Sequence, residues 1–381
     1  MSDAARTEIA RIDLPDWTEI HVAARPGSDA AGAATQIDGA FEALEGALAA
    51  HGARPADIVA ARLFLRDLGA HAAEAGAAAR RRFGGAAGPA ITLLEQPPAR
   101  SGQAIEIQAL AIVGGGAATR RAAAAGLPPG ATGGIVLGVT TERLHLAGLV
   151  GGAPGDALGF RSQADAALAR AEAGLATQGF GFDDVARTWI FLAEIGRDYA
   201  EFNHARRDFV TARALRRLPA STGIAGRPHP PDRRLSLDLI AWRGEGVLGL
   251  RTISAPTMNE APSYGSDFSR GLRVDLERRA VLYLSGTASI DGEGRVAHPG
   301  DPERQARRMI LNVEQLLAGQ GGSLRDVAQA VTYLKSAADR DVVLAACRDA
   351  GLPASIPHTL CVAAICRPEW LCEMEAMAIV G

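Results

Sequence analysis

The chain has 381 residues, of which 48% are hydrophobic, and this is enough for two or three domains that each bury a core. Its net charge of −3 provides no basic surface for a nucleic-acid backbone. Charged residues interrupt every apolar stretch before it is long enough to cross a membrane, and the N-terminus lacks the charged-then-apolar order of a signal peptide. We therefore expect a globular, cytoplasmic protein that binds neither nucleic acid nor membrane.

The first third of the chain predicts a small α+β domain. Apolar residues recur at three- and four-residue spacing from Ile37 to Leu48, which is typical of an amphipathic helix. A run of β-branched and aromatic residues that ends at Leu65 predicts a buried strand. The expected elements are a strand at 20–24, a helix at 34–50, a strand at 58–65, a helix at 70–82 and a closing strand at 104–111.

The same series of elements follows twice more along the chain. The second copy is expected to contain a strand at 144–148, a helix at 162–177, a strand at 185–192, a helix at 199–212 and a closing strand at 235–241. The third is expected to contain a strand at 281–286, a helix at 302–318, a strand at 327–334, a helix at 339–350 and a closing strand at 372–378.

An aspartate marks the register of this internal repeat. Asp57, Asp184 and Asp326 each introduce the buried strand of their copy, and the first polar residue of the closing strand follows after 49, 52 and 47 residues. A period near 130 residues is too long for a solenoid repeat. Each copy is therefore predicted to be a whole domain.

Two stretches rich in glycine, proline and alanine, at 114–134 and 244–265, are predicted to connect the copies. They place the domains at 1–118, 119–245 and 246–381. Two helices on one face of a mixed sheet leave the other face uncovered, so an isolated copy would expose apolar surface. Three copies around a common axis would bury those faces together.

The cysteines and the lysine give no indication of a cofactor. All four cysteines lie in the third copy, whereas a disulfide framework would link every copy, and no zinc-ligand spacing occurs. Lys335 is the only lysine, which makes a lysine Schiff base improbable. We expect neither a metal nor an organic cofactor.

The closing strands, the helix order and a repeated turn resemble the reactive-intermediate deaminase (Rid/YjgF) superfamily. The turn reads Pro-Ala-x-Ser/Thr at 89–92 and 219–222. The resemblance implies an α+β fold of three tandem Rid-like domains that form an intramolecular pseudo-trimer with sites in the clefts between domains. Ordinary deaminases of the superfamily carry a carboxylate-binding arginine fifteen residues before the first acid of the closing strand, where this chain has Ile91, Ser221 and His358.

Within that superfamily, several segments are similar to the chorismatases. They are 199–206, 262–265, 284–290, 298–301 and 366–375. Chorismatases remove pyruvate from chorismate, using a glutamate on the last closing strand as the acid. The types that form hydroxybenzoate also have a cysteine seven residues upstream of that glutamate.

The resemblance implies that Glu373 is the catalytic acid and that Cys366 steers the product. A carboxyl group donates a proton near neutral pH only if burial or a like charge raises its pKa, and Glu375 lies two residues away on the same strand face. Chorismate is a dianion, so cationic groups and hydroxyl donors are also needed. The expected substrate-binding residues are Arg206, Tyr199, Tyr264, Arg367, Gly286, Glu375 and His358.

We therefore expect an enzyme of secondary metabolism that acts on chorismate or a similar cyclic enol ether. Its expected product is a hydroxybenzoate, with 3-hydroxybenzoate preferred, or a dihydroxycyclohexadienoate. The alternatives are a diverged imine or enamine deaminase and a non-catalytic protein that binds small molecules. Glu106 in the first copy is expected to be structural, and Ser236 in the second cannot act as an acid. The partner is expected to be a small anionic metabolite, and the chain a monomer that can self-associate further.

Overall fold

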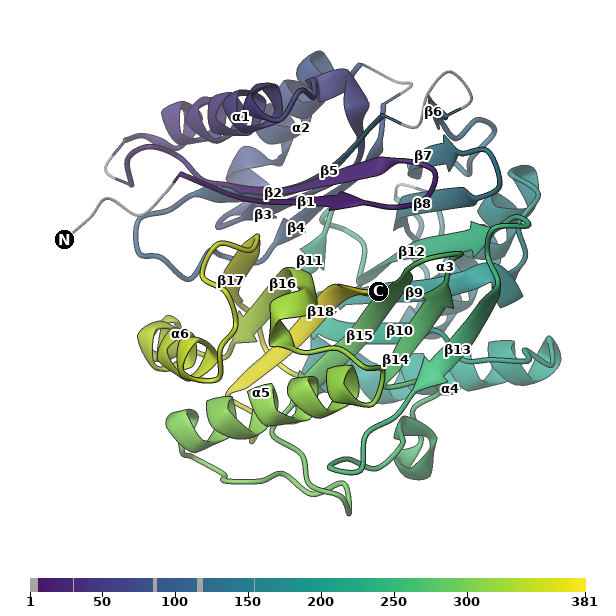
Figure 1. The fold of residues 1–381 in the computed structure, drawn as a ribbon, viewed down its shortest axis with the longest axis vertical. Helices are drawn as coiled ribbons and strands as arrows, with labels where there is room; N and C mark the ends of the chain where they lie inside the picture. Colours follow the sequence, from purple (N-terminus) through teal and green to yellow (C-terminus); the bar gives the residue numbers. More distant parts are fainter. Residues whose placement is uncertain (1–5, 30, 85–87, 115–118, 154) are drawn as a thin grey trace.

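Across its described residues, the chain folds into three α+β units, each built on a six-stranded mixed sheet with two helices on one face (Figure 1). The computed structural model describes residues 6–29, 31–84, 88–114, 119–153 and 155–381. The extreme N-terminus and the expected domain boundary at 118 lie outside these residues, so the expected boundaries stay a prediction. The α+β fold of three repeated units is confirmed.

The first unit has its strands in the order β1-β2-β5-β3-β4, with β3 and β4 parallel and the other neighbours antiparallel. Its strands are β1 (Thr7–Asp13), β2 (Thr18–Ala24), β3 (Ile58–Leu65), β4 (Ala90–Glu95) and β5 (Ile105–Val113), and its helices are α1 (Ala33–Ala50) and α2 (Leu68–Phe83). A short strand from the second unit, β11 (Arg227–Pro228), pairs with β4 at the edge of this sheet.

The second unit has the order β6-β7-β8-β12-β9-β10, and here β9 and β10 are the parallel pair. Its strands are β6 (Arg120–Ala123), β7 (Thr132–Leu137), β8 (Glu142–Leu149), β9 (Val185–Leu192), β10 (Ala220–Ala225) and β12 (Leu235–Arg243), and its helices are α3 (Phe160–Thr177) and α4 (Ile195–Ala212).

The third unit repeats the arrangement as β13-β14-β15-β18-β16-β17, with β16 and β17 parallel. Its strands are β13 (Gly249–Ile253), β14 (Gly271–Asp275), β15 (Ala280–Ala288), β16 (Val327–Leu334), β17 (His358–Val362) and β18 (Cys372–Val380), and its helices are α5 (Pro302–Ala318) and α6 (Arg340–Asp349).

Both stretches expected to connect the copies contain strands of the following unit. β6 and the start of β7 lie within 114–134, and β13 lies within 244–265. The glycines in the first stretch have a packing role: a Cβ at Gly134 on β7 would overlap the backbone carbonyl of Val59 on β3. Glycine there allows the second unit to approach the backbone of the first, which a composition-based prediction of a linker misses.

The repeated aspartate caps a short 3-10 turn before the buried strand. In each unit its carboxylate accepts the backbone N–H three residues earlier, at 2.8 Å for Asp57, 2.8 Å for Asp184 and 2.7 Å for Asp326. A second repeated residue lies 21 positions before each aspartate, on the first helix of its unit. It is a buried glutamine whose side-chain oxygen accepts a backbone N–H at or just before the closing strand, as Gln36, Gln163 and Gln305 do.

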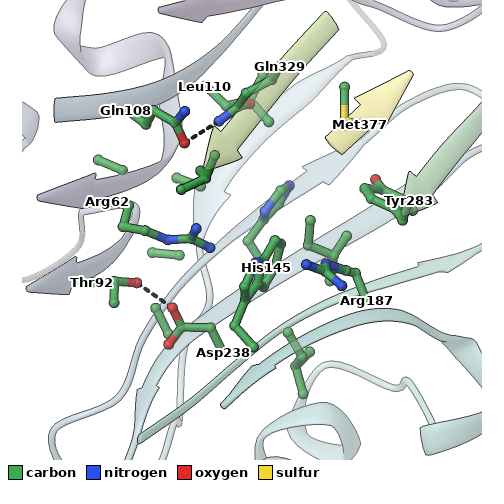
Figure 2. Close-up of a pocket in the computed structure, with 18 of the residues that line it drawn as sticks. Arg62, Thr92, Gln108, Leu110, His145, Arg187, Asp238, Tyr283, Gln329 and Met377 are labelled. Carbon is green, nitrogen blue, oxygen red and sulfur yellow. Dashed lines mark hydrogen bonds between the residues drawn. The ribbon is translucent and has the colours of Figure 1, made fainter. Parts of the chain in front are cut away.

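The inward faces of the three sheets carry equivalent rows of side chains. Pairing of β9, β12 and β8 aligns Arg187, Ile240 and His145 in the second unit. The matching rows are Ala60, Leu110 and His21 in the first unit and Gln329, Met377 and Tyr283 in the third. All of these residues line one cavity of about 120 Å³, which we call the axial cavity (Figure 2).

Apolar layers lie on both sides of the axial cavity. On the buried strands, the residues four positions after the row form one shared apolar cluster, to which the units contribute Phe64, Phe191 and Tyr333. On the closing strands, the residues two positions after the row form another, to which they contribute Ile112, Trp242 and Ile379. The sheet faces that each unit leaves uncovered are therefore buried together, as the repeat predicts.

Helices of the described part are too short or too polar for a membrane-spanning segment. Its four cysteines are free thiols, at Cys347, Cys361, Cys366 and Cys372.

Candidate active site

Glu373 is a buried carboxyl group on β18, where it pairs with Tyr333 of β16. Its side chain is only 4% exposed. Burial and the neighbouring carboxylate of Glu375 raise the pKa of Glu373 to about 8, although Arg187 and Arg270 act in the opposite direction. At neutral pH this group therefore carries its proton, which is the state that a general acid requires.

Gly286 on the adjacent strand leaves room for the carboxyl group of Glu373. A Cβ at Gly286 on β15 would overlap Oε1 of Glu373 and lie 3.1 Å from Cγ2 of Thr222. The Gly286 N–H donates to the Thr222 hydroxyl at 3.0 Å, and Thr222 belongs to β10 of the second unit. Glu373 therefore lies where β10 of the second unit packs against β15 of the third.

Helix α4 of the second unit directs two predicted residues to the same place. Tyr199 and Arg206 are seven residues apart, so both project from one face of the helix. Arg206 is 8% exposed and donates to Asn203 Oδ1 at 2.6 Å and to Ser221 Oγ at 3.4 Å. Its Nε is buried without a hydrogen-bond partner among the described residues. A buried guanidinium with an unused donor is suited to a carboxylate ligand.

Cys366 lies between the cores of the second and third units, in contact with both. Burial and then the charge of Glu373 raise the pKa of the Cys366 thiol above its usual range, while a hydrogen bond with Tyr199 opposes this. Burial, and then Cys366, raise the pKa of the Tyr199 hydroxyl. Both groups are therefore protonated at neutral pH and available as hydrogen-bond donors.

Tyr264 and Arg367 lie at the same site, on the third unit. The Arg367 guanidinium is 5.1 Å from the Tyr264 ring and 4.9 Å from the Trp370 ring, and it donates to the Gly294 carbonyl at 2.7 Å. Burial raises the pKa of Tyr264, with Arg270 opposing that shift. The more accessible side of the site around Glu373 consists of the half-buried Arg367, Tyr264 and Cys366.

Sequence reasoning missed two arginines here. Arg270 is 3% exposed, lies 5.3 Å from the Tyr264 ring and acts on the pKa of Glu373. The pairing of β14 with β15 places Arg270 at the site. In this hairpin Ser285, next to Gly286, donates its N–H to the Arg270 carbonyl at 3.0 Å. The second is Arg187, the one charged residue of β9.

Glu375 shares a strand face with Glu373, but protein donors surround it. Its Oε1 accepts from Trp189 at 2.7 Å and Arg62 at 3.2 Å, and its Oε2 accepts from Arg187 at 2.8 Å. Although burial acts to raise the pKa of Glu375, Arg187 and Arg62 hold it below its usual value. Glu375 therefore stays charged beside Glu373 and lines the axial cavity.

The structure places His358 in a different cleft, between the first and third units. Its Nε2 lies 2.8 Å from the Thr332 hydroxyl, and its backbone N–H donates to Glu8 at 3.0 Å. Burial, and then Arg25, lower the pKa of His358 to about 3, so it is neutral at physiological pH. Of the predicted residues, His358 is the one not brought to Glu373, and a neutral ring cannot supply the charge of the missing arginine.

That second cleft contains Glu106, the first unit's equivalent of Glu373. Glu106 forms an ion pair with Arg25 at 3.2 Å and accepts from Gln103 at 3.1 Å. Two acids of equivalent position therefore have different environments: Glu106 has a cation as its direct partner, whereas Glu373 has a carboxylate as its neighbour. The catalytic and binding roles assigned to the residues around Glu373 stay predictions.

Among the residues that the structure describes, no group of three or more His, Cys, Asp and Glu side chains is arranged to hold a metal ion. The group at Glu373 can donate a proton from a neutral carboxyl, donate hydrogen bonds from two hydroxyls and a thiol, and bind an anion through arginine. These capabilities fit the protonation of a small anionic molecule.

Residues 258–380 match the family model described as Endoribonuclease L-PSP. The matched span contains β14 to β18, so it covers most of the third unit and includes Glu373.

The chain is similar to a number of proteins and solved structures, and two proteins and one structure illustrate these similarities. A 3-hydroxybenzoate synthase of Streptomyces hygroscopicus is 29% identical over 226 residues, which is 52% of this chain and 65% of that protein. The chain thus matches just under two thirds of the length of that relative. The 3-aminoacrylate deaminase RutC of Acinetobacter baylyi is 29% identical over 101 residues, or 26% of this chain and 79% of that protein. A crystal structure of chorismatase has a TM-score of 0.61 at 18% identity, covering 84% of this chain and 93% of its own, which shows a shared fold.

Proposed function

We propose that this chain, a chorismatase-like member of the Rid superfamily, is an enzyme that removes pyruvate from chorismate or a similar cyclic enol ether. The observation that carries the proposal is the environment of Glu373. A carboxyl group with a pKa of about 8 lies buried at an interface between units, together with a thiol, hydroxyls and arginines. Similarity to a 3-hydroxybenzoate synthase supports the same substrate class.

The chemistry begins with a proton. In an enolpyruvyl ether, protonation of the terminal methylene carbon gives an oxocarbenium ion at the ether carbon. Water adds to that carbon and returns one proton to the glutamate, the bond to the ether oxygen breaks as the second proton moves to that oxygen, and pyruvate and the dihydroxycyclohexadienoate leave. Trapping of the ion by a neighbouring group in place of water gives 3-hydroxybenzoate and pyruvate with no net uptake of water. Glu373 supplies the proton, which as general acid catalysis is worth roughly 10²–10⁴-fold. The charge that Glu373 then carries is stabilised by Arg187 and Arg270, which favour its ionised form.

Substrate binding requires cations for a dianion. Arg206, with its unused buried donor, holds one carboxylate, and Arg270 or Arg367 holds the other. Tyr199 and Tyr264 donate hydrogen bonds to substrate oxygens. Glu373 lines neither the axial cavity nor the cavity beside His358. Binding therefore displaces side chains on the more accessible side, around Tyr264 and Arg367.

The direct test is incubation of the purified chain with chorismate while pyruvate release is followed. Pyruvate accumulation supports the proposal. Binding of chorismate without any turnover would instead indicate a non-catalytic binding protein, and absence of both would exclude chorismate as the ligand.

The pH dependence of the reaction follows from the raised pKa. Glu373 must be protonated to act, so kcat/KM is expected to be level below about pH 7 and to fall about tenfold per pH unit above the pKa of about 8. Initial rates from pH 6 to pH 10 in buffers of constant ionic strength measure this. A rate that instead rises through this range would mean that the ionised carboxylate is the active form.

Replacing Cys366 with Ala is expected to change the product and not the release of pyruvate. The thiol lies beside Glu373 and is expected to steer the intermediate towards 3-hydroxybenzoate. Without it, the aromatic fraction falls and the dihydroxycyclohexadienoate fraction rises, as chromatography of the products measures. Cys347→Ala on helix α6 is the matched control, because that buried cysteine lies away from the site. An unchanged product ratio in Cys366→Ala would exclude this role.

A second candidate function is an imine or enamine deaminase, which the similarity to a 3-aminoacrylate deaminase favours. Against it stands the loss of the arginine that holds the substrate carboxylate in ordinary deaminases of the superfamily. Ile91 and Ser221 carry no charge, and His358 is neutral. Ammonia release from 2-aminoacrylate, with no pyruvate from chorismate, would establish this alternative.

A further inference from the structure

The axial cavity lies between two apolar layers, and polar side chains from all three units project into its mainly apolar lining. All three units line it, and the residues on its walls are nearly all buried. Such a chamber is unusual in a protein core, because buried polar groups are costly unless they are paired. Its polar side chains therefore need partners, and several of them lack one.

The unpaired groups are chiefly hydrogen-bond donors. Among the described residues, Nε and Nη2 of Arg143 and Nη1 of Arg187 are buried without a hydrogen-bond partner, as is Nε2 of His145. Arg143 is 0% exposed and Arg187 is 2% exposed. The row shared by Arg187, Ile240 and His145 places two of these side chains on one wall, and Arg143 lies two residues before His145 on the same face of β8. Figure 2 shows Arg62, His145 and Arg187 around the same space.

Two acids of the chamber are each shared between two basic side chains. The carboxylate of Glu375 is shared by Arg62 at 3.2 Å and Arg187 at 2.8 Å. The carboxylate of Glu19 is likewise shared by Arg143 and by His21, the latter at 2.8 Å. Each of these acids thus serves two basic side chains.

A third acid on the wall is Asp238. Burial raises the pKa of Asp238, with Arg62 opposing the shift, and its carboxyl accepts hydrogen bonds from Thr92 and from the N–H of Gly148. Asp238 thus leaves the unpaired donors of Arg143 and Arg187 free, and guanidinium donors favour a negative guest.

Aromatic rings hold the guanidinium groups in place. The Trp189 ring lies 4.5 Å from the Arg62 guanidinium and 4.6 Å from that of Arg187. Arg143 lies 4.9 Å from the Trp242 ring. These contacts position donors before any ligand arrives, which lowers the cost of ordering the site.

We propose that the axial cavity binds one small monovalent anion, a halide or a carboxylate of one to three carbons, through Arg143, Arg187 and His145. The volume of about 120 Å³ has room for an anion of this size together with ordered water. Since each unit contributes to the walls, the anion links the three units. It binds the folded chain alone, because unfolding separates the donors. Glu373 does not line this cavity, although Arg187 acts on both, and the proposal does not depend on the proposed function.

Crystals of the full chain soaked in sodium bromide test the site directly. The expected result is an anomalous bromide peak in the axial cavity, within hydrogen-bond distance of Arg143 and Arg187. A cavity that contains only water under these conditions would overturn the proposal.

Solution measurements test whether binding occurs outside the crystal. Thermal unfolding is compared in sodium chloride, sodium formate and sodium gluconate at equal ionic strength, because gluconate is too large for the cavity. Tm is expected to be roughly 3–6 °C higher in chloride or formate at concentrations about a hundredfold above Kd. A rise in chloride alone identifies a halide site, and a rise in formate alone a carboxylate site. Equal Tm values in all three salts would overturn the proposal. A bromide peak seen together with equal Tm values would mean binding at crystal concentration only.

A variant that fills the cavity separates this effect from general salt effects. Ala60 lies on the cavity wall at the position that Arg187 occupies in the second unit. Ala60→Leu is expected to abolish the difference between chloride and gluconate, whereas the small Ala60→Ser retains it. If Ala60→Leu fails to fold, the soaked wild-type crystal and the salt series still decide. An unchanged anion effect in folded Ala60→Leu would count against the axial cavity as the site.

Discussion

Glu373→Gln is expected to lower kcat for pyruvate release by roughly 10²–10⁴-fold, because an amide of the same shape cannot act as a general acid. The protonated carboxyl is neutral at pH 7, since its pKa is about 8, so the substitution changes little of the charge balance in the buried site. Stability and substrate affinity are therefore expected to change far less than turnover. A coupled assay of pyruvate, with KM and Tm measured in parallel, separates these effects.

Glu106→Gln is the matched control for this substitution. Glu106 holds the equivalent strand position in the first unit but is paired with Arg25 and Gln103. Its replacement is expected to lower Tm, because Arg25 loses one of two acidic partners, and to leave kcat unchanged. Equal losses of kcat in both variants would mean that the carboxyl groups act through folding and that Glu373 has no special chemical role.

Gly286→Ala is expected to reduce turnover by about 10²-fold, since an ångström-scale displacement of a reacting group has effects of this size. The new Cβ would overlap Oε1 of Glu373 on one side and crowd Thr222 on the other, so the carboxyl group has to move. Overpacking of this kind also destabilises a core by about 1–3 kcal/mol. Measurements of kcat and of denaturant unfolding give the two effects independently.

The matched control is Gly46→Ala on the exposed side of helix α1, where a Cβ meets nothing within 4 Å. Alanine is the better helix former, so this variant is expected to gain about 0.5–1 kcal/mol of stability and to keep full activity. Full activity in Gly286→Ala would show that the position of the Glu373 carboxyl is not critical.

The repeat was readable in the sequence because its signals are local. An aspartate that caps its own turn and a strand made of consecutive β-branched and aromatic residues depend on residues a few positions apart. The repeated glutamine 21 residues before each aspartate has a backbone partner 66–71 residues further along the chain, so no local pattern indicates it. Local patterns also explain why the predicted order of helices and strands was confirmed. The glycine-rich stretches were predicted as linkers but contain strands, because their glycines allow close contact with another unit.

Most residues of the candidate site were also predictable, through resemblance to a family and not through geometry. Tyr199, Arg206, Cys366 and Glu373 come from two units, and the structure brings them together across an interface. His358 fits the sequence pattern equally well, yet the structure places it in another cleft. Arg270 was missed because its place depends on the register of β14 with β15.

Three copies of one α+β unit, and the strand face on which each polar residue lies, follow from local patterns, because turns, helices and strands have short periods that neighbouring residues set. Which copies meet at which face follows from the packing of the units alone. That packing separates Glu373, with a carboxylate beside it and a pKa of about 8, from the equivalent Glu106, which has an arginine beside it. The arginines that face each buried carboxyl come from positions distant in the chain, and they help to set its protonation.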